Sequence, residues 1–297
     1  MPTYRFKQVD VFSDRHFRGN PVAVVLDADD IDSAEMQQIA AWTNLSETTF
    51  VLKPTTDEAD YLLRIFTPTS ELPFAGHPTI GSAHAALEAA AIEPKNGRLR
   101  QECGLGIIDL TIENAPNQPE NGDDRLISFE ASPKVGESFE SSAEAISTAL
   151  GADISVDPAP RSVDVGAVWV VCYMEDERAV RNLRPDMSAV ARLSENFDLP
   201  GICVFALGGE AGAAIRVRCF APYFGVPEDP VTGSANACIG RYLVETGLIE
   251  KTGREYRSSQ GDELGREGRL VIRVSNDGAS VKVGGHAVTT VDGTISV

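Results

Sequence analysis

A six-residue pattern, Pro-x-x-Gly-Ser-Ala, occurs twice in this chain and limits what it can fold into more than any other feature. The copies occupy residues 78–83 and 230–235 and begin 152 residues apart, close to half of the 297-residue length. Recurrence at half the length indicates a duplicated unit. Each copy leads into small and apolar residues, so each is expected to open a helix, with Pro78 at the first helical position.

A second pair of short segments supports the duplication. Residues 66–68 and 220–222 both read aromatic-x-Pro, and Arg64 and Arg218 stand two residues before them. This offset is 154 residues, so one of the two connections to the following helix was shortened. We therefore expect two similar halves, each of which sends a loop into the start of one helix.

The helix that follows the first copy has almost no polar face. Its apolar positions are Ile80, Ala83, Ala85, Ala86, Leu87, Ala89 and Ala90. A helix that is apolar all round is buried rather than laid on a surface. Residues 233–245 are also mostly apolar, and β-rich segments flank both helices. The expected fold is α+β, with two pseudo-symmetric lobes, each a strand barrel around a buried central helix.

The boundary between the lobes is expected in the segment 114–124, which is rich in Asn, Pro and acidic residues and is typical of a linker. The chain is long enough for two lobes with separate cores. We assign residues 1–115 to an N-terminal lobe and residues 125–283 to a C-terminal lobe. The strand-like tail, residues 284–297, is assigned to the N-terminal lobe.

The charge of the chain argues against several classes of partner. Its formal net charge is −18, from 26 Lys and Arg against 44 Asp and Glu. Nucleic acids and anionic membranes need a basic surface, so neither is expected to bind. No segment approaches the roughly 20 apolar residues of a membrane span, and the N-terminus does not resemble a signal peptide. We expect a cytoplasmic protein with a small-molecule partner.

Metal and cofactor motifs are also missing. The five cysteines are odd in number, show no Cys-x-x-Cys spacing and lie mostly in apolar runs. None of the four histidines is paired with another at metal-ligand spacing. The dinucleotide fingerprint, the phosphate loop and the nucleophile elbow are not present. Neither a metal nor a cofactor is expected.

The two helix starts are the remaining candidates for chemistry. A helix N-terminus presents backbone N–H groups and a positive dipole, and two of them facing across a cleft would hold a carboxylate or an enolate. His77 directly precedes the first copy of the pattern, Asp229 directly precedes the second, and Ser234 lies within the second. The alternative is that Pro and Gly-Ser only start helices well and that these side chains are ordinary loop residues.

Glu47 has no acidic counterpart in the second half of the chain. It stands at a corner between a helix that should end near Asn44 and a strand that begins at residue 48. The position 154 residues later is Gly201, so the geometry of the repeated unit does not require a carboxylate there. An acid supplied by one half only indicates a chemical task, with a solvated surface glutamate as the alternative.

Three longer segments carry a resemblance to a known family. They read NLSETTFV at residues 44–51, FTPTSELPFAGHP at residues 66–78 and EDPVTGSA at residues 228–235. Together they closely resemble the PhzF-like isomerases of phenazine biosynthesis, and the resemblance extends from Gln8 to the C-terminal strands. It implies a diaminopimelate epimerase-like fold with the site between two lobes.

The resemblance also implies a cofactor-free proton shuttle and, because family members are commonly dimers, a homodimer. A glutamate at the position of Glu47 would remove a proton from a dihydro-hydroxyanthranilate and return one elsewhere on the ring, which requires a raised pKa. The implied catalytic residues are Glu47, His77, Asp229 and Ser234, and the implied substrate-binding residues are Gly76, Gly233, Ser46 and Asn20.

Two departures bear on the substrate and the reaction. Phenazine-type members tend to read Gly-Arg-Pro near the end, whereas Arg266 is followed here by Glu267. The epimerases of this fold carry a cysteine at each helix start, where this chain has His77 and Ser234, which disfavours a two-thiol racemase. The alternatives are an epimerase or racemase that pairs Glu47 with His77 or Asp229, and a catalytically silent carboxylate-binding or regulatory protein.

Overall fold

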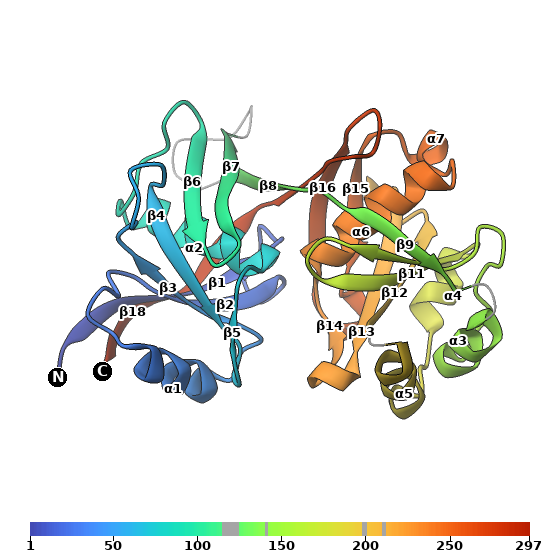
Figure 1. Cartoon of the computed structure of the whole chain (residues 1–297), viewed down its shortest axis with the longest axis horizontal. Helices are drawn as coiled ribbons and strands as arrows, with labels where there is room; N and C mark the ends of the chain where they lie inside the picture. The colour runs from blue at the N-terminus through green and yellow to red at the C-terminus, as the bar shows by residue number, and fades with distance from the viewer. Residues whose placement is uncertain (115–124, 140–141, 198–200, 210–211) are drawn as a thin grey trace. The chain divides into compact units, whose positions relative to one another are not determined.

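The computed structural model describes residues 1–114, 125–139, 142–197, 201–209 and 212–297. The expected linker at 114–124 therefore lies almost wholly outside the described residues. The chain forms two compact units, one made of residues 1–130 and 284–297 and the other of residues 131–283 (Figure 1). Within the described residues, no helix is long and apolar enough to cross a membrane.

The first unit is a run of paired strands with a C-terminal strand at one end. Strand β18 pairs antiparallel with β1, β1 with β2, β3 with β4, β6 with β7 and β7 with β8, while β2–β3 and β4–β6 are parallel pairs. The short β5 pairs with β4. The strands are β1 (Thr3–Val11), β2 (Asn20–Val25), β3 (Thr48–Leu52), β4 (Tyr61–Phe66), β5 (Glu71–Leu72), β6 (Arg98–Cys103), β7 (Gly106–Asn114), β8 (Arg125–Ala131) and β18 (Ala287–Ser296).

The second unit repeats this order of pairings. Strand β9 pairs antiparallel with β10, β10 with β11, β12 with β13 and β15 with β16, while β11–β12 and β13–β15 are parallel. Its short strand β14 pairs with β13. The strands are β9 (Lys134–Ser138), β10 (Arg161–Asp164), β11 (Val168–Met174), β12 (Gly201–Leu207), β13 (Ile215–Ala221), β14 (Val226–Asp229), β15 (Glu255–Gln260), β16 (Gly268–Val274) and β17 (Val281–Gly285).

One central helix in each unit is buried among the strands (Figure 1). These helices are α2 (Gly76–Glu88) and α6 (Gly233–Glu245), each 13 residues long. Every residue of α2 from His77 to Leu87 is buried, as the lack of a polar face predicts. The other helices are α1 (Ser33–Thr43), α3 (Ala143–Leu150), α4 (Glu177–Asn182), α5 (Met187–Phe197) and α7 (Ile249–Thr252).

The helix starts correct one sequence-based expectation. Helix α2 begins at Gly76, so Pro78 is its third residue and not its first. Extended Ala75 provides the cap, and proline is tolerated in the first turn because N–H groups there have no intrahelical acceptor. The two Pro-x-x-Gly-Ser-Ala copies are consequently not equivalent, since Gly81 lies inside α2 whereas Gly233 begins α6.

Strand register gives the true correspondence between the halves. Thr48 pairs with Phe66 in the first unit and Ile202 with Phe220 in the second, an offset of 154 residues. The position equivalent to Glu47 is therefore Gly201, as expected. The helix starts are 157 residues apart, so the second connection is three residues longer than the first.

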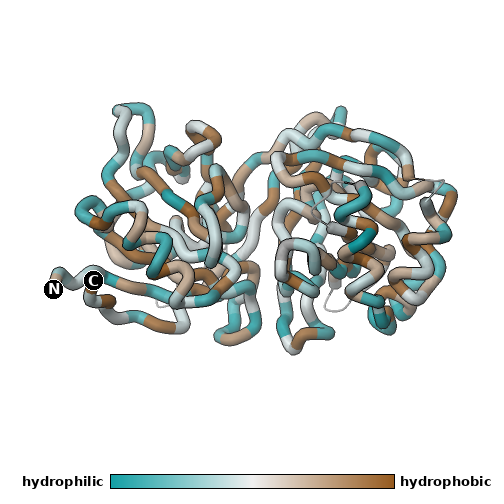
Figure 2. The backbone as a smooth tube through the Cα atoms, turned by 60° about the horizontal axis from the view of Figure 1, so that its bottom comes forward, coloured by the Kyte–Doolittle hydropathy of each residue, from teal (hydrophilic) through white to brown (hydrophobic). Residues whose placement is uncertain are grey.

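Local signals explain other elements. Asp32 forms the capping box expected at the start of α1, and Asn44 ends the helix in the left-handed conformation. Hydrophilic and hydrophobic segments alternate along both units (Figure 2), because strands such as β16 bury every second residue. Helix α4, the short α7 and strand β15 were not predicted from the sequence.

Candidate active site

Glu47 and His77 lie together in the first unit. Glu47 is the last residue before β3, and His77 is the second residue of α2. The distance from His77 Nε2 to Glu47 Oε2 is 3.4 Å, and the side chains are only 8% and 15% exposed, respectively. A carboxyl and an imidazole are therefore held beside one another at the start of the central helix.

The environment of Glu47 changes its acidity. Burial, which disfavours the charged form, raises the pKa of the Glu47 carboxyl to about 7, although a hydrogen bond with the Ser46 side chain opposes the shift. A carboxyl group with a pKa near neutrality is ionised in part of the population and protonated in the rest. It can both accept and donate a proton at that pH.

The start of α2 leaves no room for a side chain at its first position. A Cβ on Gly76 would lie 2.6 Å from Phe129 Cζ, and Phe129 packs edge-on against Phe74. The Ala75 cap supplies no side-chain acceptor to the helix. The N–H groups of the first turn are therefore not capped by a side chain of the preceding residue, which suits an anion at this end.

A second set of polar side chains lies at the start of α6. Asp229 ends β14 and accepts a 2.7 Å hydrogen bond from Thr232 Oγ1. Ser234, the second residue of α6, accepts a 3.0 Å hydrogen bond from Trp169 Nε1. Asp229 and Ser234 are thus placed by the same helix start, with Gly233 as its first residue.

Gln260 fixes the backbone of this helix start. Its Nε2 donates to the Asp229 carbonyl and to Thr232 Oγ1, both at 2.9 Å. Its Oε1 accepts from the Thr232 N–H at 3.1 Å and from Asn236 Nδ2 at 3.2 Å. The four bonds specify the orientation of the Gln260 amide and tie the end of β15 to the residues on either side of Pro230.

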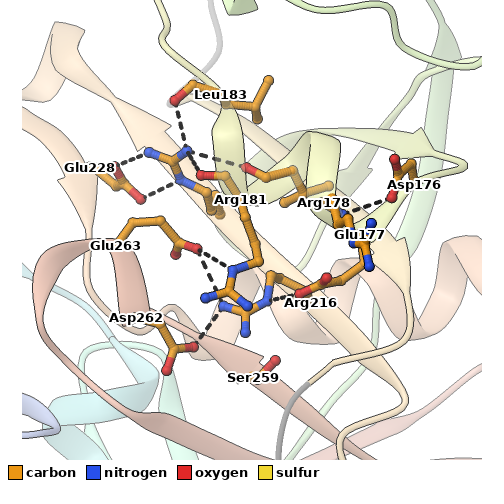
Figure 3. A network of polar contacts seen from close by, with 12 residues as sticks. Asp176, Glu177, Arg178, Arg181, Leu183, Arg216, Glu228, Ser259, Asp262 and Glu263 are labelled. Atoms are coloured by element: carbon orange, nitrogen blue, oxygen red, sulfur yellow. Dashed lines mark hydrogen bonds and ion pairs between the residues drawn. The ribbon is translucent and has the colours of Figure 1, made fainter.

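An arginine–glutamate pair anchors the strand that leads into α6. Arg218 binds Glu228 through two bonds of 2.8 Å, and its guanidinium lies 5.1 Å from the centre of the Phe220 ring. Glu228 directly precedes Asp229, so the pair anchors the strand that carries this acid. The fully buried Arg216 lies beside it and contacts Glu177, Asp262 and Glu263 (Figure 3).

The residues expected from sequence fall into two groups. Ser46, Glu47, Gly76 and His77 belong to the first unit, and Asp229, Gly233 and Ser234 belong to the second. Asn20 is a buried residue at the start of β2, three positions before Ala23, which pairs with Thr48, the residue after Glu47.

Sequence reasoning missed Trp169, Thr232 and Gln260. Trp169 and Gln260 act through contacts with residues distant in the sequence. Thr232 lies within the segment EDPVTGSA at residues 228–235, but its hydrogen bonds to Asp229 and Gln260 were not predicted. Among the described residues, no group of three His, Cys, Asp or Glu side chains is arranged to hold a metal ion. The five cysteines are buried and free.

Comparisons with known proteins place the chain in a family. Residues 9–293 match the PhzC-PhzF family, described as phenazine biosynthesis-like protein. The chain belongs to this family. It is 43% identical to antisense-enhancing sequence 1 of Schizosaccharomyces pombe, with 99% of each chain covered. It is 37% identical to trans-2,3-dihydro-3-hydroxyanthranilate isomerase of Pseudomonas fluorescens, with 97% of each covered.

Solved structures confirm the fold. A PhzF-family phenazine biosynthesis protein of Bacillus anthracis superposes with a TM-score of 0.87 at 26% identity, with 100% of each chain covered. A probable proline racemase of Agrobacterium radiobacter, 14% identical, gives a TM-score of 0.64 over 99% of this chain and 92% of the racemase, which shows the fold alone. The predicted epimerase-like α+β fold and the predicted enzyme class, an isomerase, are confirmed.

Proposed function

We propose that this isomerase moves a proton between two carbons of a small cyclic carboxylate, without a cofactor, with Glu47 as the shuttle. The substrate would be similar to trans-2,3-dihydro-3-hydroxyanthranilate, the compound named for the Pseudomonas relatives. One observation carries the proposal. The Glu47 carboxyl is held beside His77 in surroundings that raise its pKa to about 7, which suits one group for both halves of a proton transfer.

The reaction divides into two steps at Glu47. In the first step the carboxylate takes a proton from a ring carbon, and the electron pair of the broken C–H bond is delocalised into the ring π-system. In the second step the neutral carboxyl returns the proton to another ring carbon, giving an enol that tautomerises to a ketone. No atom or electron is gained or lost overall. His77, 3.4 Å away, holds the Glu47 carboxyl in one orientation.

The other expected residues are proposed to bind the polar groups of the same substrate. Asp229 suits a substrate amino group because it is an acceptor held in place by Thr232. The backbone N–H groups of Gly76 and Gly233 suit oxygen atoms, because both residues begin helices. Ser46 and Asn20 complete the proposed set.

The distance between Glu47 and His77 disfavours a racemase that uses these two residues as opposing bases. Racemisation by two groups requires them on opposite faces of the reacting carbon. That carbon does not fit between Glu47 and His77, whose nearest side-chain atoms are 3.4 Å apart. Pairing of Glu47 with Asp229 would produce an epimer of the substrate, which chiral chromatography of the product distinguishes from a positional isomer.

The test replaces Glu47 by Gln, which keeps the size of the side chain and removes its acid–base function. With trans-2,3-dihydro-3-hydroxyanthranilate in D2O, we expect turnover and deuterium incorporation to fall at least about 100-fold, the lower range for loss of a general acid–base group. Glu58→Gln, at an exposed loop position, serves as the control and should keep full activity. Full activity in the Glu47→Gln variant would refute the assignment.

A catalytically silent binding protein would give a different result. It would bind the carboxylate in a thermal-shift assay and exchange no carbon-bound hydrogen, in the wild type as well as in the Glu47→Gln variant. The homodimer expected from the resemblance stays a prediction, which sedimentation of the full chain would check.

A further inference from the structure

The Trp169 indole occupies in the second unit the place that Glu47 occupies in the first. By strand register, Trp169 neighbours Gly201, the counterpart of Glu47. A Cβ on Gly201 would lie 2.9 Å from Trp169 Cζ3 and 2.3 Å from the Phe220 carbonyl oxygen. No side chain fits at this corner of the second unit, and the indole packs against it instead.

The indole contacts the same helical position that Glu47 contacts in the first unit. His77 and Ser234 are the second residues of the two equivalent central helices. His77 faces the Glu47 carboxyl at 3.4 Å, and Ser234 faces the Trp169 N–H at 3.0 Å. An acid–base pair in one unit thus corresponds to a donor–hydroxyl pair in the other.

The chemistry of indole decides which way the Ser234 hydroxyl points. Indole N–H is a donor only and does not ionise in the working range of a protein. Ser234 Oγ must therefore accept from Trp169, which is 6% exposed. Among the described residues, Ser234 Oγ has no other side-chain or backbone hydrogen-bond partner, so its own hydrogen is left for a ligand.

We propose that Trp169 is a positioning residue that makes Ser234 a hydrogen-bond donor to an acceptor oxygen of the substrate, its carboxylate in the first instance. The inference deepens the proposed function and rests on it for the identity of the substrate. Its consequence is a division of labour. Proton transfer is assigned to Glu47 in the first unit, and the equivalent place in the second unit, occupied by the Trp169 indole, supplies a hydrogen-bond donor for an oxygen atom instead of a second base.

The first measurement needs no substrate. The chain has two tryptophans, and the other one, Trp42, is 78% exposed. The 15N-labelled full chain should therefore show two indole N–H signals, which a Trp42→Phe variant assigns. We expect the Trp169 N–H to exchange slowly with water and to shift in the Ser234→Ala variant, whereas Ser188→Ala, on the exposed face of α5, leaves it unchanged. An unmoved signal in Ser234→Ala would overturn the hydrogen bond.

The second measurement uses anthranilate as a stable probe and aniline, which lacks the carboxylate, as its matched control. Anthranilate should shift the Trp169 indole signal in the wild type and not in Ser234→Ala, and aniline should shift it in neither. An equal response to the two compounds would overturn the recognition of an acceptor oxygen. A carboxylate-dependent response in a protein that does not turn over the dihydro-hydroxyanthranilate would support the inference and refute the proposed substrate.

The third measurement separates positioning from simple structural support. Trp169→Phe keeps an aromatic ring and removes the donor. With trans-2,3-dihydro-3-hydroxyanthranilate we expect KM to rise about fivefold, as for loss of one hydrogen bond, with kcat and the pH profile within twofold of wild type. In the Ser234→Ala background Trp169→Phe should have no further effect on KM. Additive effects, or a fall in kcat with unchanged KM, would contradict the proposal.

Discussion

At the scale of single residues, Glu47 shows how position makes an ordinary carboxyl useful. A solvated glutamate has a pKa of about 4.3 and is a weak base at neutral pH. Here burial raises the pKa to about 7, so the carboxylate is a stronger base and the protonated form is also populated near neutral pH. His77 Nε2 lies 3.4 Å from this carboxyl group.

The pH dependence of the reaction follows from this pKa. Glu47 must be ionised to accept a proton, and its pKa in the folded chain is about 7. We therefore expect kcat/KM to rise with pH, about tenfold per unit below pH 7, and to level off above it. The measurement is a pH–rate profile of initial velocities at low substrate. A plateau that extends down to pH 5 would show that a group with an ordinary carboxyl pKa acts as the base.

His77, Asp229 and Ser234 were selected because each lies next to one of the two expected helix starts in the sequence, and Glu47 because it has no acidic counterpart in the second half. Their roles in catalysis stay predictions. The sequence did not allow prediction of Trp169 or of Gln260, which sit 65 and 24–31 residues from their partners along the chain. Such contacts depend on strand register, and register is set by the whole sheet rather than by neighbours in sequence. Duplication arguments could locate Gly201 but not the side chain that fills its space.

At the scale of elements, the starts of the two central helices are held by different contacts. In α2 the limiting contact is between Gly76 and the Phe129 ring. In α6 the polar bonds of Gln260 hold the backbone on either side of Pro230. The expected proline at the first position of α2 was wrong because the sequence pattern marks a helix start only to within a few residues.

Replacement of Gly76 by Ala tests the close approach at α2. The new Cβ would lie 2.6 Å from Phe129 Cζ, and Phe129 is only 2% exposed. Relief requires a shift of packed groups, so we expect a loss of about 1–3 kcal/mol in the free energy of unfolding. Gly293→Ala is the control, because a Cβ there meets nothing within 4 Å. Its stability should stay within about 0.5 kcal/mol of wild type.

Thermal and urea unfolding of the two variants would give these values. Replacement of the Phe129 ring by the smaller leucine side chain, in a Gly76→Ala, Phe129→Leu double variant, should return part of the lost stability if the contact between the new Cβ and the ring is the cause. A Gly76→Ala variant as stable as Gly293→Ala would show that the Phe129 ring moves aside at no cost.

At the scale of the whole molecule, the two halves share the same strand pairings and a buried central helix but differ in the side chains around the helix start. The same order of strand pairings encloses one buried helix in each unit. The arginine–aromatic–glutamate arrangement also recurs, with Arg64 over Phe66 and Arg218 over Phe220, both at 5.1 Å. Chain order and periodicity were enough to predict this frame, because buried helices and alternating strands have local signatures. The burial of each copy was not predictable, since it depends on which later segments cover it.

The two arginine–glutamate ion pairs differ in burial and should therefore contribute unequally to the free energy of unfolding. Arg64 and Glu71 form two bonds of 2.7 Å but are 24% and 43% exposed. Arg218 and Glu228 form two bonds of 2.8 Å and are 6% and 9% exposed. Exposed ion pairs contribute at most about 1 kcal/mol, whereas removal of one partner of a buried pair costs about 3–5 kcal/mol, because a charge is left in low dielectric.

The same substitution in each unit tests this difference. Glu228→Gln should lower the free energy of unfolding by about 3 kcal/mol or more, and Glu71→Gln by less than about 1 kcal/mol. Urea unfolding in low and in high salt would separate them further, because salt screens the exposed pair and scarcely affects the buried one. Equal losses would mean that the Val180 and Leu183 carbonyl oxygens, which also accept from Arg218, are sufficient to hold its charge. A larger loss of unfolding free energy for Glu228→Gln than for Glu71→Gln would show that the second unit depends on its buried ion pair, whereas the equivalent pair of the first unit adds little to stability.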